Sequence, residues 1–446
     1  MQSSTYVHQT SLFAPAESEI LAEYAALEAR IPFVEAPEYA DLVNFNRNGQ
    51  LPVHGWYYFK EGFSSQLVLD LLSRYRARQS GLVLDPFAGS GTTPLTCQMA
   101  GVPSVGVEFN PFFTFVARAK LNWWQYSPER LRPVVEELLR YDGPADHLPA
   151  LSTFERIYDE PARVDLMRAK RFIRTVPLAV ETDRDFLKLG LAAIVEKVSP
   201  ARKDGKGLKI RRNCRVVPVK EALRTQFERM LADLVSLGAD RRPGDAAVAS
   251  AQMLQGDARR LTEVADDSID FAVYSPPYLN SFDYSEVYKV ELWLFDHIRD
   301  AHEFRSYRAK SLRSHVSTPV DWTYRLRHPV IDHICWHVAG QPLWNRHIPA
   351  MINGYFDDMY LVLKEQFRAC RPGARVACVV GNSSYASLPV PTDALLAVIA
   401  EQVGFRLVEV LVARHLGTSS QQLASYDRRL RARYLRESVV VLEKPG

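Results

Sequence analysis

The 446-residue sequence has few cysteines and no long apolar run. Its five cysteines are odd in number and never spaced C-x-x-C, which favours reduced thiols over a disulfide framework. No ten consecutive residues are apolar, so we expect no membrane-spanning helix. The amino terminus lacks the basic start and apolar core of a secretory signal. These absences predict a soluble, cytoplasmic protein.

Two common nucleotide-binding signatures are also missing from the glycine-rich turn at residues 88–91. A proline at position 94 breaks the G-x-G-x-x-G pattern, which disfavours a nicotinamide dinucleotide. No Gly-Lys-Ser/Thr follows the turn, which excludes a P-loop.

The net charge is only +3, because 55 Lys and Arg nearly balance 52 Asp and Glu. The basic residues are nevertheless clustered. The segment 202–224 holds nine basic and two acidic residues, and a second cluster spans 299–328. A solvated helix face explains any single cluster, but several in a nearly neutral chain favour a polyanionic partner.

The apolar pattern between residues 55 and 124 predicts a βαβ unit. A helix over 66–78 precedes a strand at 82–84, the glycine turn, a helix ending at Gly101, and a strand at 104–107. Strand and helix signals alternate again from residue 251 to the carboxyl end, which predicts an α/β fold with a mostly parallel sheet.

Four regions follow from these signals. Residues 1–50 form an amino-terminal extension, and 51–124 with 251–446 form a discontinuous catalytic domain. Residues 125–250 read as a mostly helical insertion, a candidate DNA-binding region, and 297–350 as a basic, aromatic insertion that is a candidate for target recognition.

The first group of chemically informative residues is the glycine turn with its flanking acids. Asp85 ends the strand before the turn, and Glu108 ends the next strand. Glycines let a ligand approach the backbone, and the following helix amino terminus favours negative charge. An acid at the tip of the second strand can accept both ribose hydroxyls of a nucleoside. A purely structural turn remains the alternative.

The second group is Ser275-Pro276-Pro277-Tyr278, directly after a predicted buried strand. Two prolines restrict the backbone and hold the serine hydroxyl and a carbonyl as fixed acceptors. The tyrosine offers an aromatic face, so the loop suits a planar base with an exocyclic amine. A stiff turn with a core tyrosine is the competing interpretation.

Together these residues resemble the family of DNA amino-methyltransferases, which transfer a methyl group from S-adenosylmethionine to exocyclic base nitrogens. The resemblance covers about 50–124 and 251–295 and implies a class I, Rossmann-like methyltransferase fold of seven strands with an antiparallel last strand. It also implies the following cofactor-binding residues: Phe63, Ser64, Asp85, Pro86, Phe87, Ala88, Gly89, Gly91, Thr92, Glu108, Asp257 and Ala258.

The resemblance implies that Ser275, Pro276, Pro277 and Tyr278 are catalytic, and the serine variant is typical of cytosine-N4 enzymes. Expected partners are double-stranded DNA and a cognate restriction endonuclease or other defence-system subunits, in restriction–modification or phage defence. Adenine-N6 modification, guanine-N2 modification of RNA, and a non-catalytic DNA-binding subunit remain alternatives.

Basic residues of the two insertions are the predicted DNA contacts, namely Lys203, Lys206, Lys209, Arg305, Arg308 and Arg313. A metal site is not expected. Residues 332–337 contain two histidines and a cysteine that would share one face of a strand, but no second cluster has zinc spacing. Asn280, Asp283 and Tyr284 either line the base pocket or form a surface loop.

Overall fold

The computed structural model describes residues 16–76, 81–204, 207–211, 214–238, 250–319, 325–416 and 433–446. In this part of the chain no helix is long and apolar enough to cross a membrane.

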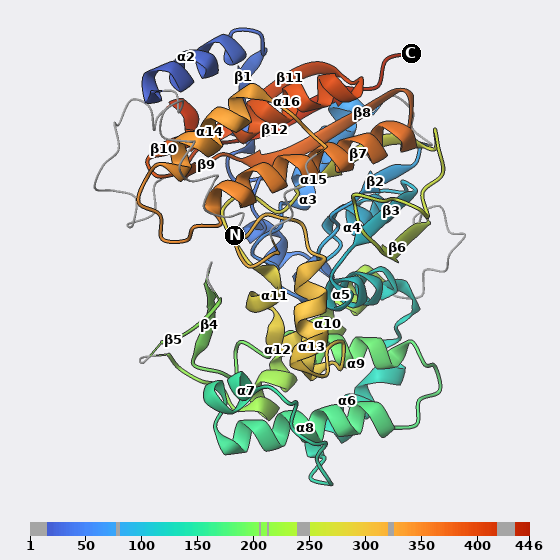
Figure 1. The fold of residues 1–446 in the computed structure, drawn as a ribbon. Helices are drawn as coiled ribbons and strands as arrows, with labels where there is room; N and C mark the ends of the chain where they lie inside the picture. Colours follow the sequence, from blue (N-terminus) through green and yellow to red (C-terminus); the bar gives the residue numbers. More distant parts are fainter. Residues whose placement is uncertain are drawn as a thin grey trace.

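An eight-stranded sheet forms one end of the molecule (Figure 1). Its strands, in spatial order, are β1 (Phe33–Glu35), β11 (Arg406–His415), β12 (Arg436–Glu443), β8 (Cys370–Gly381), β7 (Ile269–Tyr274), β2 (Val83–Asp85), β3 (Ser104–Glu108) and β6 (Ala251–Gln255). The strands that neighbour one another from β8 to β6 are all parallel, whereas β12 runs antiparallel to both β8 and β11.

Counted along the chain from β2, the seven strands stand in the order 3-2-1-4-5-7-6 with the last one antiparallel. This arrangement confirms the predicted class I methyltransferase fold. The eighth strand, β1, was not predicted. It joins the edge of the sheet parallel to β11, with Phe33 opposite Val410.

Helices cover both faces of the sheet, and the pleat of the strands assigns alternate residues to the two faces. In β7, Phe271 and Val273 pack with α3 (Ser65–Tyr75), while Ala272 and Tyr274 pack with α15 (Ile348–Ala369) and α16 (Thr392–Val403). The strands are therefore buried on both sides, which explains their continuous apolar sequence.

The helix boundaries agree with several of the sequence signals. Ser64 caps α3 by accepting a hydrogen bond from the Gln66 amide. Helix α4 (Thr92–Met99) is capped by Gly91 rather than by Thr92, and α5 (Pro111–Leu121) follows β3. Helix α2 (Glu17–Glu28) was not predicted.

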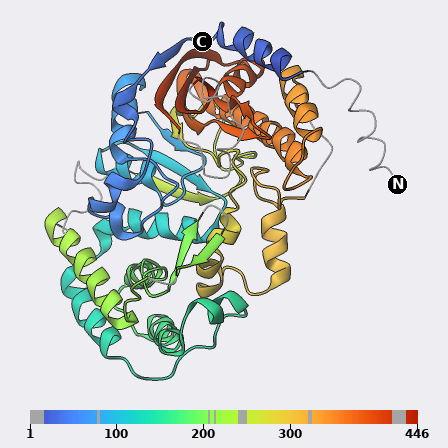
Figure 2. The same cartoon turned by 90° about the vertical axis from the view of Figure 1, so that its left-hand side faces the viewer.

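The segment between β3 and β6 forms the opposite end of the molecule (Figures 1 and 2). It comprises α6 (Pro128–Arg140), α7 (Ser152–Ile157), α8 (Glu160–Thr175), α9 (Asp183–Ala192), the hairpin of β4 (Ala201–Asp204) and β5 (Gly207–Ile210), and α10 (Val219–Leu237). Its apolar residues share one core with α5 and with Trp56, so the helical segment is packed directly onto the sheet end.

The segment after β7 reaches both ends of the molecule. It contains α11 (Tyr284–Val287), α12 (Lys289–Leu294), α13 (Ala301–Ala309) and α14 (Pro329–Ala339). Helices α12 and α13 lie beside the helical segment, whereas α14 packs against α15 and α2 (Figure 1). Short elements complete the chain: η2 (Pro37–Tyr39), η3 (Asn46–Gln50), η4 (His54–Trp56), η5 (Trp123–Gln125), β9 (Ser383–Tyr385) and β10 (Leu388–Val390).

The predicted strand at residues 332–337 is wrong, because these residues lie in helix α14. In this helix the two side chains have different surroundings. Cys335 is buried, whereas His333 contacts Glu23 of α2 at 2.7 Å. Among the residues that the structure describes, no group of three or more His, Cys, Asp or Glu could hold a metal ion.

Candidate active site

A cavity lies at the carboxyl edge of β2, β3 and β7, where open α/β sheets bind ligands. Most of the predicted cofactor and catalytic residues line it: Phe63, Asp85, Pro86, Phe87, Ala88, Gly89, Thr92, Glu108, Asp257, Ala258, Ser275 and Pro277. Ser64, Gly91, Pro276 and Tyr278 are not on its wall. The structure therefore brings together residues from five separate parts of the sequence.

The glycine turn needs its glycines for both backbone conformation and packing. Gly89 and Gly91 have φ angles of 50° and 85°, in the left-handed region that side chains disfavour. A Cβ atom on Gly89 would lie 2.8 Å from the Phe59 ring, and one on Gly91 would lie 2.8 Å from Ala117. The turn can therefore approach its neighbours, and a ligand in the cavity, more closely than any substituted backbone.

Two carboxyl groups stand beside this turn, the buried Asp85 and the partly buried Glu108. Asp85 accepts a hydrogen bond from the Phe87 amide at 3.0 Å, and Glu108 accepts from the amides of Gly89 at 2.8 Å and Asn110 at 2.7 Å. Burial raises the pKa of Asp85 to about 7 and the pKa of Glu108 to about 7, against the opposing effect of these hydrogen bonds. Both groups are thus poised to change charge near neutral pH.

The loop after β7 divides its side chains between the cavity and the sheet. Ser275 and Pro277 line the cavity. The Tyr278 hydroxyl donates to Glu437 of β12 at 2.6 Å, and the Tyr278 ring packs against Gly381. The structure therefore does not bring Tyr278 onto the cavity wall as an aromatic plate.

Sequence reasoning missed much of the opposite wall. Tyr307, Ser311, Leu312, Ser314 and His315 all line the cavity and all come from the second insertion. These residues follow no periodic pattern, so the sequence holds no signal for their position. Of the three open candidates after the catalytic loop, Tyr284 lines the cavity, while Asp283 caps α11 and Asn280 is exposed.

The second insertion contacts the cavity wall at Phe109, which directly follows β3. The rings of Phe109 and Tyr307 stack with centroids 5.1 Å apart and planes 14° apart. Two buried polar atoms of the wall, Asn110 Nδ2 and His315 Nδ1, have no hydrogen-bond partner. Such atoms are costly unless a ligand or water satisfies them.

The charge of the wall indicates the kind of ligand that fits. The described lining residues include four carboxylates, Glu61, Asp85, Glu108 and Asp257, but no lysine or arginine. A polyphosphate would be repelled there, whereas a ligand with cationic and hydroxyl groups would be matched. The aromatic side chains Phe59, Phe63, Phe87, Phe109 and Phe113 supply apolar surface for a planar group.

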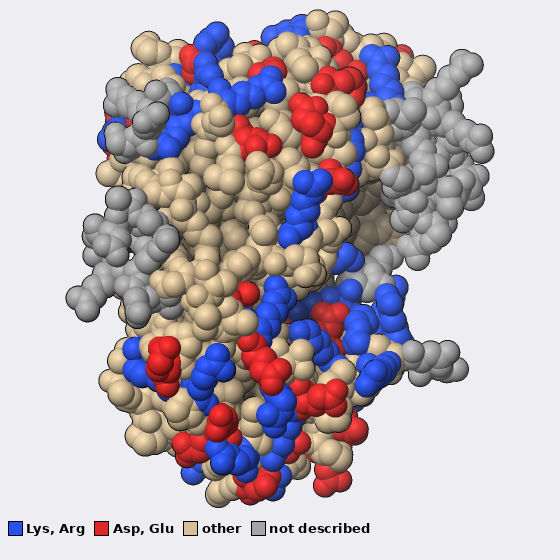
Figure 3. Space-filling model, turned by 180° about the vertical axis from the view of Figure 1, so that it is seen from behind, with Lys and Arg blue, Asp and Glu red and all other residues tan. Residues whose placement is uncertain are grey.

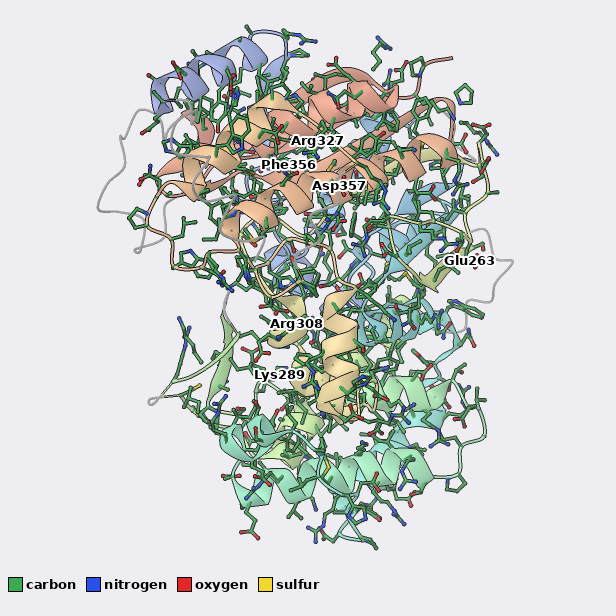
Figure 4. The ribbon with its side chains drawn as sticks, viewed as in Figure 1. Glu263, Lys289, Arg308, Arg327, Phe356 and Asp357 are labelled. Atoms are coloured by element: carbon green, nitrogen blue, oxygen red, sulfur yellow. The ribbon has the colours of Figure 1, made fainter. Side chains whose placement is uncertain are left out.

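The predicted DNA contacts have mixed positions. Lys203 is turned inward to the buried carboxylate of Glu291, and Arg313 pairs with Asp357 and Asp358 of α15 at 2.7 Å each. Arg308 bonds Glu286 at 2.8 Å, and Lys289 contacts the same glutamate (Figure 4). The cations of Lys203, Arg308 and Arg313 are therefore paired with acids of this chain, and their contact with phosphates stays a prediction.

Two predicted contacts lie on the surface and one lies outside the described residues. Lys209 on β5 and Arg305 on α13 are exposed. Lys206 falls in the part of the chain that the structure does not describe.

Comparison with known proteins reveals relatives over most of the chain. No family model matches the sequence. The Type II methyltransferase M.BsoBI of Geobacillus stearothermophilus is 28% identical over 460 residues, which cover 91% of this chain and 88% of the relative. The Type II methyltransferase M.AvaI of Anabaena variabilis is 26% identical over 441 residues, covering 91% and 89%.

Solved structures resemble the chain less closely. A putative DNA modification methylase from Thermus thermophilus, complexed with S-adenosyl-L-methionine, is 21% identical over 43% of this chain and 52% of that chain, with a TM-score of 0.22. Over nine-tenths of its length, the chain is similar to Type II methyltransferases, and its glycine turn and the residues Ser275 and Pro277 lie on the wall of one cavity.

Proposed function

We propose that the protein is an S-adenosylmethionine-dependent DNA methyltransferase that modifies an exocyclic base amine, with cytosine N4 as the favoured target. The observation that carries this proposal is the meeting of Ser275 and Pro277 with Asp85 and Glu108 on one cavity wall. A cofactor site and an acceptor loop for an amine thus lie within reach of the same ligand. The similarity to Type II methyltransferases over 91% of the chain supports the same activity.

The carboxylates and the aromatic side chains of the cavity wall suit the proposed cofactor. Glu108 at the tip of β3 would accept the ribose hydroxyls, as an acid at this position does in nucleotide-binding sheets. Asp257 and Ala258, which follow β6, would lie beside the adenine, and Phe63 and the glycine turn beside the remainder. The bound cofactor supplies an activated methyl group on a sulfonium.

The protein would contribute position and hydrogen bonding rather than a strong base. The Ser275 hydroxyl on the cavity wall and the carbonyl of Pro276, which stands between the wall residues Ser275 and Pro277, would accept hydrogen bonds from the exocyclic amine. These hydrogen bonds draw the lone pair of the amine out of the ring. The proton can leave after the methyl group arrives. Pro276 and Pro277 keep both acceptors fixed, so that little reorganisation is needed during the reaction. A base must leave the double helix to reach this cavity.

The duplex would bind along the hollow between the two ends of the molecule. Figure 3 shows Lys and Arg side chains gathered along one side of that hollow. Lys209 on the β4–β5 hairpin and Arg305 on α13 are the exposed candidates for phosphate contacts. We assign backbone binding to the helical insertion 125–250 and target recognition to 297–350, because the latter supplies part of the cavity wall.

The choice of base and the biological role are the finer parts of the proposal. Serine at position 275 favours cytosine N4, with adenine N6 and then guanine N2 of RNA as the alternatives. A role in restriction–modification with a cognate endonuclease would follow from the names of the relatives. A non-catalytic DNA-binding subunit is the alternative from another class.

Nucleoside mass spectrometry of DNA from cells that express the protein tests the activity directly. We expect N4-methylcytosine with the wild-type chain and none with Ser275→Ala. N6-methyladenine without N4-methylcytosine would reverse the choice of base. DNA binding with no methylated nucleoside in DNA or RNA would favour the non-catalytic alternative.

A further inference from the structure

We infer that Glu61 binds the α-ammonium group of the cofactor's amino-acid portion, and that Tyr288 and Lys203 hold Glu61 in place for this contact. The inference rests on the proposed function and assigns a role to a residue outside the recognised motifs. Glu61 lies on the cavity wall, two residues before Phe63.

The order of the strands indicates which end of the cavity Glu61 occupies. Asp257 follows β6 and Phe109 follows β3, so both lie toward the β6 edge of the sheet. Glu61 precedes α3, and α3 packs over β7. A short connection leads from α3 into β2, which places the amino end of α3 at the carboxyl edge of the sheet. Glu61 therefore lies toward β2 and β7, opposite the adenine end.

A nucleoside cofactor placed by Glu108 must then point its tail toward Glu61. The ribose stands at the tip of β3, with the adenine toward β6. The remaining direction along the sheet edge leads past the glycine turn to Ser275 and Glu61. This is the end where the methyl group must meet the amine, and the amino-acid portion is attached to the same sulfur atom.

The other carboxylates of the wall already have partners that suit different roles. Glu108 accepts two backbone amides beside the ribose position. Asp257 is paired with Arg259 at 2.7 Å, and Asp85 accepts the Phe87 amide within the glycine turn. At the β2–β7 end the wall carries Asp85 and Glu61, and Asp85 is buried whereas Glu61 is partly exposed, so Glu61 is the one that a cationic group of the ligand can approach.

A chain of side chains beneath the cavity holds Glu61. The Tyr288 hydroxyl donates to Glu61 Oε2 at 2.6 Å. The Lys203 ammonium lies 4.1 Å from the centre of the Tyr288 ring, and it also contacts Glu291 and the Tyr57 hydroxyl. Burial raises the pKa of Glu61, while the Tyr288 hydrogen bond and the Lys203 charge act against that rise and favour the carboxylate.

Lys203 belongs to the β4–β5 hairpin of the helical insertion, so the contacts from Lys203 through Tyr288 to Glu61 link the insertion to the cofactor site. An anionic Glu61 of fixed orientation is what an ammonium group requires, because a charge-assisted hydrogen bond depends on both charge and direction. Lys203 and Tyr288 are positioning residues in this arrangement, since neither lines the cavity.

Calorimetric binding of two ligands tests the inference without any catalytic step. The first ligand is S-adenosylhomocysteine, and the second is its analogue that lacks only the α-amino group. Glu61→Gln should weaken binding of the first about 10- to 100-fold and binding of the second less than about 3-fold, since hydrogen bonds to charged groups are the strong ones. Tyr288→Phe should also weaken binding of the first ligand more than binding of the second, but by a smaller factor than Glu61→Gln.

The matched control is Glu263→Gln, an exposed glutamate away from the cavity (Figure 4), which should change neither affinity. Retained binding of the amino-free analogue by Glu61→Gln would show that the variant is folded.

Three outcomes would overturn the assignment to Glu61. The first is an equal loss of affinity for both ligands in Glu61→Gln, which would mean that Glu61 has a structural role. The second is no loss of affinity for either ligand. The third is wild-type protein that binds the two ligands equally well. Unchanged ligand binding with a raised KM for DNA would instead assign Glu61 to the target base. If the wild-type chain binds neither ligand, the proposed function itself fails.

Discussion

Two carboxyl groups on the cavity wall, Asp85 and Glu108, are held away from water beside the glycine turn. Burial raises both pKa values to about 7, whereas in the unfolded chain they lie near 4. The folded state therefore binds more protons than the unfolded state between these values. Their contribution to stability is largest at low pH and is lost as pH rises from about 4 to about 7.

We expect the free energy of unfolding of the ligand-free protein to carry this signature. Each group contributes a slope of up to about 1.4 kcal/mol per pH unit within that window. Urea unfolding at pH 5, 6, 7 and 8 should therefore give a shallower decline for Glu108→Gln than for the wild type. Parallel declines for the two proteins would show that the Glu108 pKa is not raised by folding.

Cofactor affinity should also depend on the protonation of Glu108, but it should rise with pH where the stability falls. A ribose hydroxyl donates to a carboxylate, so protonation of Glu108 competes with binding. With a pKa of about 7, affinity for S-adenosylhomocysteine should fall about 10-fold between pH 8 and pH 6. In Glu108→Gln the affinity should be lower throughout and lose this dependence, which calorimetry at the two pH values would measure.

The β4–β5 hairpin is attached to the rest of the protein by a buried ion pair between Lys203 and Glu291. The Lys203 side chain is 14% exposed and its partner Glu291 is 1% exposed. We expect Lys203→Met to cost about 3–5 kcal/mol in the free energy of unfolding, because it leaves Glu291 buried without its counter-charge. Urea denaturation would measure this loss.

The neighbouring strand provides the control for that prediction. Lys209 pairs in register with Arg202 and is exposed, so Lys209→Met should change stability by less than about 0.5 kcal/mol. A loss in Lys203→Met no larger than in Lys209→Met would mean that the buried ion pair does not hold the hairpin to α12.

On the face of the molecule that Figure 3 shows, some of the Lys and Arg side chains gather along one side of the hollow between the sheet and the helical segment. Lys209 on β5, Arg211 directly after β5 and Arg305 on α13 are exposed. Replacing all three by Gln should weaken binding to duplexes of every sequence. The slope of log K against log salt should flatten by about 0.9 for each phosphate that the variant no longer neutralises.

Fluorescence anisotropy at several salt concentrations would measure this slope. Arg30→Gln is the control, since its side chain is 70% exposed on the amino-terminal side of the sheet and should leave the slope unchanged. An altered methylated sequence at an unchanged slope would reverse the roles assigned to the two insertions.

Much of the sheet and the motif side of the cavity could be predicted from the sequence. The strands around Leu84, Val105 and Val273 are short apolar runs bounded by turn residues, and such signals act over a few residues. Glycines with positive φ and prolines after Ser275 likewise restrict the backbone locally. The class of fold followed from this alternation because parallel strands with helical connections have few arrangements.

Tertiary structure alone decided which side chains meet. Residues 332–337 form a helix because one face packs on α15 and α2, a contact that the short apolar pattern could not reveal. Lys203 faces inward because Glu291, 88 residues away, is buried beneath the cavity. Tyr307 and His315 reach the cavity for a similar reason, since the chain between β7 and α15 folds back over Phe109.

Local residue types thus determined the elements and the motif loops of this protein. The far wall of the cavity and the direction of its basic side chains depended on partners far apart in the chain. Such contacts are selected by burial and charge pairing in the assembled core, and these energies exist only once the distant segments have come together.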